Sequence, residues 1–178
     1  MIRSFFATIK SNPLYRFVVI AFLLYTSWYI LYEFFIKPLQ VVDLFVVDNT
    51  ISTSESILNS LGFKTYSGYD RLLGIDGTNG LWIGDKCNGI ELFSLFAIFI
   101  IAYPGKFFKK FFFIPIGIGL IHVLNIARVV GLAIVQLNFP EWTEFNHTYI
   151  FNVIIYGVIF CLWIIWINKF SGKKLKTI

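Results

Sequence analysis

The chain has 178 residues, of which 57% are hydrophobic, 20% are aromatic and only 14% are charged. A soluble domain is about half apolar and about one quarter charged, so this composition excludes an ordinary soluble protein and indicates a membrane protein. The formal net charge of +5 does not indicate a nucleic-acid partner, because the basic residues flank hydrophobic runs instead of forming one solvated stripe.

The first apolar run, from Phe17 to Tyr32, predicts a transmembrane helix over about residues 15–36. It is too long for the apolar region of a signal peptide, and no small-residue cleavage site follows it, so we expect the helix to be retained. Three further spans are predicted at about residues 88–103, 111–136 and 148–168. The second is short, and the third contains Pro115, which favours a kink or a tilt.

Residues 37–86 form the only sizeable region outside the predicted spans. Leu39–Val47 is apolar but includes Asp43, and Ile51–Gly62 begins with Ser and Thr cap signals, so one or two amphipathic helices are expected on the outer face. Tyr66–Asp85 is rich in Gly, Asp and Asn and predicts turns or a short hairpin. The predicted fold is an all-α, single-domain membrane bundle over residues 1–178, with about four transmembrane helices.

The distribution of charge predicts the orientation in the membrane. The segments Met1–Leu14, Pro104–Lys110 and Lys169–Ile178 together hold nine Lys and Arg residues and no Asp or Glu. Residues 37–86 instead contain four basic and six acidic residues. The positive-inside rule therefore predicts that both termini are cytoplasmic and that residues 37–86 lie outside.

Three reactive side chains fall at the same predicted depth. At 1.5 Å of rise per residue, Cys87, Arg128 and His147 lie about 24–32 Å from the inner ends of their spans, and therefore near the outer surface. Cys161 lies roughly 21 Å deeper than His147 on the same helix, too far for a disulfide with Cys87. We expect Cys87 to be a free thiol close to a fixed cation and an imidazole.

Each of these residues also has a structural interpretation. A lone Cys in a membrane helix is usually a small hydrophobe, an Arg near a helix end can extend to the headgroups, and His147 can simply begin a helix. His122, near the middle of the bilayer, is expected to be hydrogen bonded. A metal site built from Cys87, His122 and His147 is disfavoured, because His122 is about 9 Å too deep.

The residues Cys87-Asn88-Gly89, Asn125-Ile126-Ala127-Arg128 and His147 resemble the Cys, Arg and His signatures of the exosortase/archaeosortase family. These proteins are multi-pass membrane cysteine transpeptidases. The resemblance covers roughly half of the chain, from Gly84 to the C-terminus, and the short length is similar to compact exosortases of Bacteroidetes-type bacteria. Glu91 is a departure, because a carboxylate one turn below the thiol opposes formation of a thiolate.

The three reactive residues suggest a cysteine-nucleophile mechanism. A thiol of ordinary pKa, about 8.5, is mostly protonated at neutral pH, and a neighbouring imidazole can accept its proton. Cys87 is therefore predicted as nucleophile, His147 as general base and Arg128 as the cation that stabilises the oxyanion. Asn88 and Asn125 are candidates for supporting hydrogen bonds.

Glu91 is expected to pair with Arg128, which limits the cost of a charge near lipid. The same pair leaves another class open, a non-enzymatic membrane assembly factor or small transporter subunit in which the ion pair is structural. A transporter, however, usually holds its ionisable residues near the middle of the bilayer.

The resemblance implies the substrate, which is a secreted protein with a C-terminal sorting signal made of a short motif, a transmembrane helix and a basic cluster. Cleavage at the outer face of the bacterial cell (inner) membrane would leave an acyl-enzyme, which passes to an acceptor amine or another nucleophile. The lipid bilayer is the other expected partner. The resemblance implies no soluble cofactor and no metal.

Overall fold

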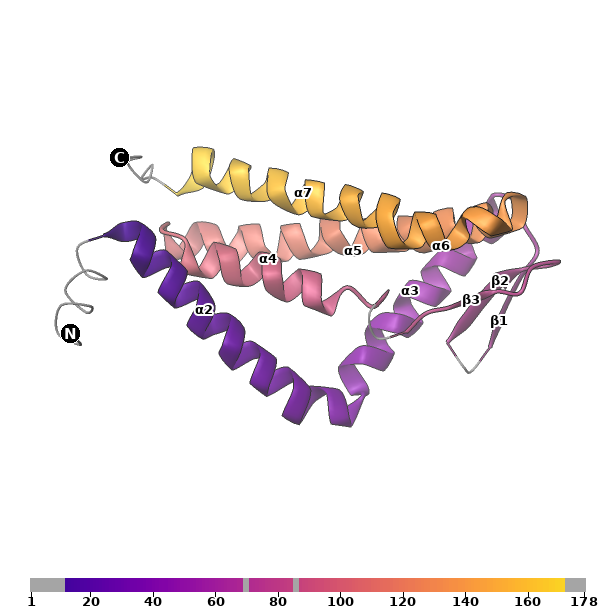
Figure 1. Cartoon of the computed structure of the whole chain (residues 1–178), viewed down its shortest axis with the longest axis horizontal. Helices are drawn as coiled ribbons and strands as arrows, with labels where there is room; N and C mark the ends of the chain where they lie inside the picture. Colours follow the sequence, from indigo (N-terminus) through magenta and orange to yellow (C-terminus); the bar gives the residue numbers. More distant parts are fainter. Residues whose placement is uncertain (1–11, 69–70, 85–86, 172–178) are drawn as a thin grey trace.

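A computed structural model describes residues 12–68, 71–84 and 87–171 of the chain. Most of the described chain is helical (Figure 1), and three helices are long and apolar enough to cross a membrane: Pro13–Leu39, Phe107–Asn138 and Pro140–Phe170. A fourth apolar helix, α4 (Ile90–Ala102), rises only about 20 Å, which is less than the roughly 30 Å of hydrocarbon in a bilayer. The predicted helical membrane architecture is confirmed, but four full-length spans are not.

The first long helix begins at a cap and ends at a reversal. The Asn12 side chain accepts a hydrogen bond from the Leu14 amide at 3.0 Å, and Pro13 occupies the first position of α2 (Pro13–Leu31). A π-helical turn (Tyr32–Ile36) and a 3₁₀ turn (Lys37–Leu39) extend α2. Gln40 then adopts a left-handed conformation, and α3 (Val41–Ser60) leaves in a new direction, so the two helices form a V (Figure 1).

The sequence suggested one or two amphipathic helices lying on the outer face in this region, but the structure has one helix that packs against α5 (Phe107–Asn138). Val47 and Leu58 of α3 are fully buried, in a cluster with Ile126 and Val129 of α5. Thr50 and Ser54 on α3 are also fully buried. Small polar side chains let two helix backbones approach closely, so one face of α3 is buried against α5, while its other face, with Val41 and Phe45, stays exposed, as expected of an amphipathic helix.

Residues 65–82 form a three-stranded antiparallel sheet, where the sequence indicated turns or a short hairpin. The strands β1 (Thr65–Gly68), β2 (Leu72–Ile75) and β3 (Leu81–Trp82) are ordered β1-β2-β3. Leu73 and Ile75 bury one face of the sheet in the cluster shared by α3 and α5. Hence the all-α prediction is wrong for this segment, which covers the end of α5.

The helices α4, α5 and α7 (Phe151–Ile165) pack side by side (Figure 1). They share a second cluster of fully or almost fully buried side chains: Phe96, Ile100, Ile121, Ile155, Ile159 and Trp166. Lys110 caps the C-terminal end of α4 by donating to the carbonyls of Ile101 and Tyr103, both at 2.7 Å. A short link joins α5 to α7 and consists of a 3₁₀ turn (Pro140–Trp142), α6 (Thr143–Phe145) and a π-helical turn (Asn146–Ile150). A further π-helical turn (Trp166–Phe170) follows the C-terminal end of α7.

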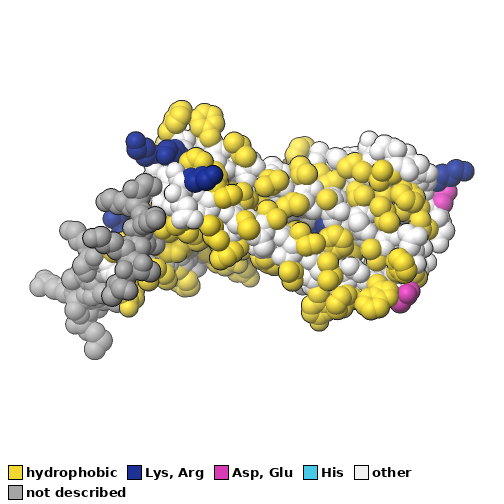
Figure 2. All heavy atoms as spheres, turned by 90° about the horizontal axis from the view of Figure 1, so that it is seen from above, with side chains coloured by type: hydrophobic (Ala, Val, Ile, Leu, Met, Phe, Trp, Pro, Cys, Tyr) yellow, Lys and Arg dark blue, Asp and Glu magenta, His cyan; other side chains and the backbone are white. Residues whose placement is uncertain are grey.

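The outer surface of the bundle is unusually apolar. Figure 2 shows hydrophobic side chains over most of one face, with basic and acidic groups mainly toward its ends. Large side chains are exposed on several helices, for example Phe22 at 67%, Phe107 at 82% and Val153 at 72%. Soluble monomers rarely expose apolar patches of this extent, so lipid is the natural covering for this surface.

Candidate active site

A tight turn at the start of α4 carries Cys87. The Cys87 amide donates to the Gly84 carbonyl at 2.8 Å, and Gly89 has a φ of 81°, in the left-handed region that favours glycine. The Asn88 side chain accepts a hydrogen bond from the Ile90 amide, two residues on, at 2.9 Å, which fixes the turn that leads into the helix. This local geometry leaves the Cys87 side chain half-buried at the N-terminal end of α4.

The imidazole of His147 meets this thiol. Cys87 Sγ lies 3.5 Å from His147 Nε2, although 60 residues separate the two in sequence. His147 is half-buried in the π-helical turn Asn146–Ile150, just before α7. The thiol sulfur and the imidazole nitrogen are therefore close enough for a proton to pass directly between them.

Arg128 of α5 is the third residue of the cluster. It is only 6% exposed, and its Nη2 donates to the His147 carbonyl at a long 3.4 Å. Its Nε is buried and has no hydrogen-bond partner in the described part of the chain. A guanidinium has five N–H donors, so this buried cation retains unused capacity to bind an anionic oxygen.

These three side chains line a cavity of about 410 Å³ between α4 and α7. The α7 side carries Thr148, Asn152 and Tyr156, whose spacing of four residues places them on one helix face. Sequence reasoning missed these three, although a polar stripe in an apolar helix is a readable signal. A smaller cavity of about 40 Å³ reaches the same thiol and imidazole from the side of β3.

Asn125 and Glu91, both predicted to support the site, differ in what they contact. Asn125, fully buried, donates from Nδ2 to the Cys87 carbonyl at 2.8 Å. Glu91 lines the 410 Å³ cavity, but no ion pair of 4 Å or less joins it to Arg128, so the predicted pair is wrong. The reason is local: Glu91 lies on the exposed face of the first turn of α4, whereas Arg128 donates to the His147 carbonyl.

Asp43 was noted in the sequence only as an acidic residue of an expected amphipathic helix and was not predicted to belong to the site. It is 1% exposed, and its Oδ1 accepts hydrogen bonds from Tyr32 Oη at 2.5 Å and from Asn88 Nδ2 at 2.6 Å. The available signal was an acidic residue within the apolar run Val41–Val47. Asp43 thus contacts the residue that follows the thiol.

The remaining polar candidates lie apart from the cluster. Both Cys87 and Cys161 are free, as predicted, and Cys161 is exposed on α7. His122 Nε2 lies 2.8 Å from Asn49 Oδ1 at the α3–α5 interface, which agrees with the expected hydrogen-bonded role. Across residues 12–68, 71–84 and 87–171, no group of three or more His, Cys, Asp or Glu side chains is placed to hold a metal ion.

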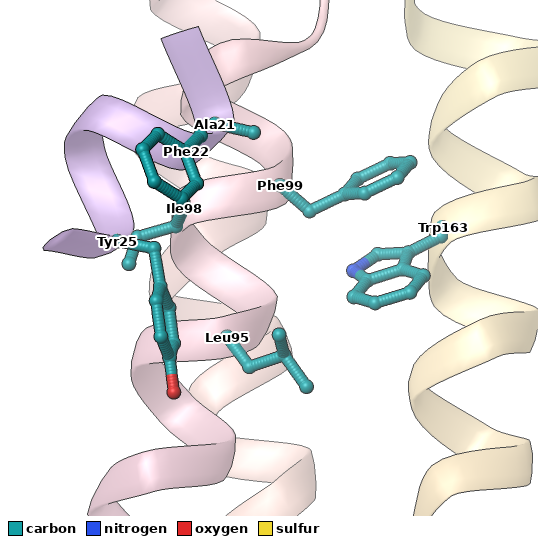
Figure 3. Close-up of a pocket in the computed structure, with 7 residues that line it drawn as sticks. All are labelled: Ala21, Phe22, Tyr25, Leu95, Ile98, Phe99 and Trp163. Atoms are coloured by element: carbon teal, nitrogen blue, oxygen red, sulfur yellow. The ribbon is translucent and has the colours of Figure 1, made fainter. Parts of the chain in front are cut away.

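A third cavity, which is apolar and has a volume of about 260 Å³, lies further along α4 and α7, where α2 joins them (Figure 3). Its lining includes Tyr25 of α2, Leu95 and Phe99 of α4, and Trp163 of α7. Phe99 and Trp163 stack with ring centroids 4.2 Å apart. Apolar lining therefore continues along the helix pair that frames the polar cavity.

No known family model, curated protein or solved structure matches this chain.

Proposed function

We propose that the protein is a membrane cysteine peptidase or transpeptidase of the exosortase type, with Cys87 as its nucleophile. The observation that carries this proposal is the 3.5 Å contact between Cys87 Sγ and His147 Nε2 beside the buried Arg128, all in one cavity. A free thiol in contact with an imidazole is the general arrangement of an activated cysteine nucleophile.

The proposed reaction has two stages. His147 Nε2 accepts the proton of the thiol while Cys87 Sγ attacks a peptide carbonyl, and a tetrahedral intermediate forms. The C–N bond then breaks, the leaving amine takes the proton from His147, and a thioester remains on Cys87. An incoming amine, or another nucleophile such as water, attacks the thioester, returns a proton through His147 and releases the thiol.

Arg128 is proposed to stabilise the oxyanion of both intermediates. Its unused donors at a largely desolvated position support this role, because a preorganised cation needs no reorganisation as negative charge develops. Asn125 supports the site from the other side by holding the Cys87 carbonyl. Glu91, exposed in the same cavity, is proposed to contact the substrate instead of neutralising Arg128.

The proposed setting is the inner membrane of a bacterium, with both termini cytoplasmic, four crossings and the site on the outer side. The start of α2, the turn between α4 and α5 and the end of α7 lie at one end of the molecule, and the sheet lies at the other (Figure 1). Lys106, Lys109 and Lys110 follow α4 at the first end, which the positive-inside rule assigns to the cytoplasm.

The proposed substrate is a secreted protein whose C-terminal sorting signal contains a transmembrane helix. Such a helix would arrive within the bilayer and bring the scissile bond to the cavity at the end of α4. The apolar cavity deeper between α2, α4 and α7 supports lateral docking, because its lining is made of apolar and aromatic side chains such as Leu95, Phe99 and Trp163 (Figure 3). No nucleic acid or soluble cofactor enters this mechanism.

The alternative, a non-enzymatic assembly factor or transporter subunit, was based on a structural Glu91–Arg128 pair. The lack of that ion pair removes its main support.

The decisive experiment is mass analysis of the full-length protein after co-expression with secreted proteins that carry candidate sorting signals. We expect an acyl adduct on Cys87 when turnover is slowed, and no adduct on Cys161. If Cys87 stays unmodified while substrate is cleaved, the covalent mechanism is wrong.

A further inference from the structure

A buried hydrogen-bonded chain connects the turn at Cys87 to the reversal between α2 and α3. Tyr32 is 7% exposed, Asp43 1% and Asn88 1%. Tyr32 Oη and Asn88 Nδ2 both donate to Asp43 Oδ1, at 2.5 and 2.6 Å. The three residues belong to the turn after α2, the first turn of α3 and the turn before α4, so three separate elements meet at one carboxyl group.

Asn88 uses both ends of its side chain in this arrangement. Its Nδ2 donates to Asp43, and its Oδ1 accepts the Ile90 amide at 2.9 Å. The peptide bond that joins Cys87 to Asn88 is held as well, because Asn125 Nδ2 donates to the Cys87 carbonyl at 2.8 Å. The backbone next to the thiol is therefore held by α3 through Asp43 and by α5 through Asn125.

A buried acidic group is a costly way to stabilise a fold. Asp43 Oδ2 is buried without a hydrogen-bond partner among the described residues, and no Lys, Arg or His within the described ranges pairs with this carboxyl group within 4 Å. Burial of such a group costs several kcal/mol unless it is fully paired, so an apolar residue would serve packing better. This cost points to a function in placing Asn88.

We propose that Asp43 is a positioning residue, which, together with Tyr32, holds Asn88 and thereby keeps the Cys87 thiol in contact with His147. This inference rests on the proposed function, because it concerns the same thiol–imidazole pair. The Cys87–His147 separation of 3.5 Å leaves little tolerance, and a misplacement of about 1 Å can cost roughly a hundredfold in rate. Asp43 itself lies outside the cavity and touches no reacting atom.

The test measures alkylation of Cys87 by iodoacetamide in the purified full-length protein, in a Cys161→Ala background so that one thiol reacts. The rate is measured near neutral pH and again well above the ordinary thiol pKa of about 8.5. The neutral rate reports activation by His147, whereas the alkaline rate reports access to the thiol alone. A purely structural defect opens the site and changes the alkaline rate.

We expect Asp43→Ala and Asn88→Ala to lower the neutral rate by on the order of tenfold or more and to leave the alkaline rate unchanged. Asp43→Asn keeps an oxygen acceptor and should lose less, and Tyr32→Phe should lose least because Asn88 keeps its partner. The matched control is Asp48→Asn, an exposed carboxyl group on the same helix, which should match the parent. If Asp43→Ala fails to accumulate, the near-isosteric Asp43→Asn and Tyr32→Phe decide the question in the same assay.

The outcomes separate this inference from the proposed function. If His147→Ala slows neutral labelling but Asp43→Asn and Asp43→Ala do not, the positioning role is refuted and the thiol–imidazole pair stands. If His147→Ala itself has no effect, the proposed catalytic pair fails, and the positioning role fails with it. The double variant Asp43→Ala/His147→Ala should label no more slowly than His147→Ala alone, because Asp43 acts through that pair. Additive losses would contradict this.

Discussion

Replacement of Arg128 gives the sharpest separation between a catalytic and a structural role. Its hydrogen bond from Nη2 to the His147 carbonyl is long, at 3.4 Å, and its Nε has no hydrogen-bond partner in the described chain. A hydrogen bond from a charged donor contributes about 1.5–3 kcal/mol to stability and less when it is this long, and removal of a buried cation also relieves a desolvation cost. Arg128→Met and Arg128→Ala should therefore insert and accumulate near the level of the parent.

The effect on the reaction should be much larger than the effect on stability. Loss of one preorganised donor to an oxyanion costs about 2.7–4 kcal/mol of transition-state stabilisation, or roughly 10²–10³ in rate. Arg128→Lys keeps a positive charge but loses the planar fork, so we expect its rate to fall between those of the parent and Arg128→Ala.

The assay is a pulse-chase of a co-expressed protein that carries a sorting signal, with enzyme abundance followed in the same membranes. Arg128→Met is the informative variant because it keeps the length of the apolar stem and removes only the charge and the donors. Normal processing by Arg128→Met would refute the oxyanion role. Failure of this variant to accumulate would instead assign Arg128 to the fold.

Three further predictions test the rest of the site. Cys87→Ala and Cys87→Ser should abolish substrate processing, whereas Cys161→Ala, on the exposed face of α7, should leave it intact, and equal losses would contradict the assignment. His147→Ala should fail at acylation, so mass analysis should find unmodified Cys87 and gels should show uncleaved substrate; normal processing would place the proton acceptor elsewhere. Reporters fused at Met1 and at Ile178 should both be active only in the cytoplasm, and activity outside the cell would overturn the proposed topology.

The sequence was most informative where one local property decides the structure. Long apolar runs predicted the helices that α2, α5 and α7 form, because apolar length and the spacing of polar breaks are local features. The rise per residue also predicted that Cys161 and Cys87 form no disulfide, and both are free thiols, since helix geometry converts sequence distance into depth.

Features that depend on distant partners could not be predicted in the same way. Thr50 and Ser54 suggest a solvent-facing helix, yet both are buried in α3, and Thr50 Oγ1 donates to the Val46 carbonyl of its own helix at 2.8 Å. The predicted Glu91–Arg128 pair failed because depth alone does not fix which way a side chain points. The contact of Asp43 with Asn88 joins residues 45 positions apart, on α3 and in the turn before α4, so it depends on the tertiary arrangement and not on local sequence.

The unequal lengths of α4 and α5 explain why the thiol lies where it does. The 13 residues of α4 rise about 20 Å, whereas the 32 residues of α5 rise about 48 Å, so α5 extends far beyond the start of its neighbour. Cys87 lies in the turn just before the short helix, and Arg128 lies about 32 Å along α5, close to His147 in the turn before α7. The step between the two helix ends leaves a space that α3 and the sheet cover on one side and the polar face of α7 borders on the other. A full-length α4 would fill this step with helix, and the thiol would no longer face a polar cavity at the edge of the apolar bundle.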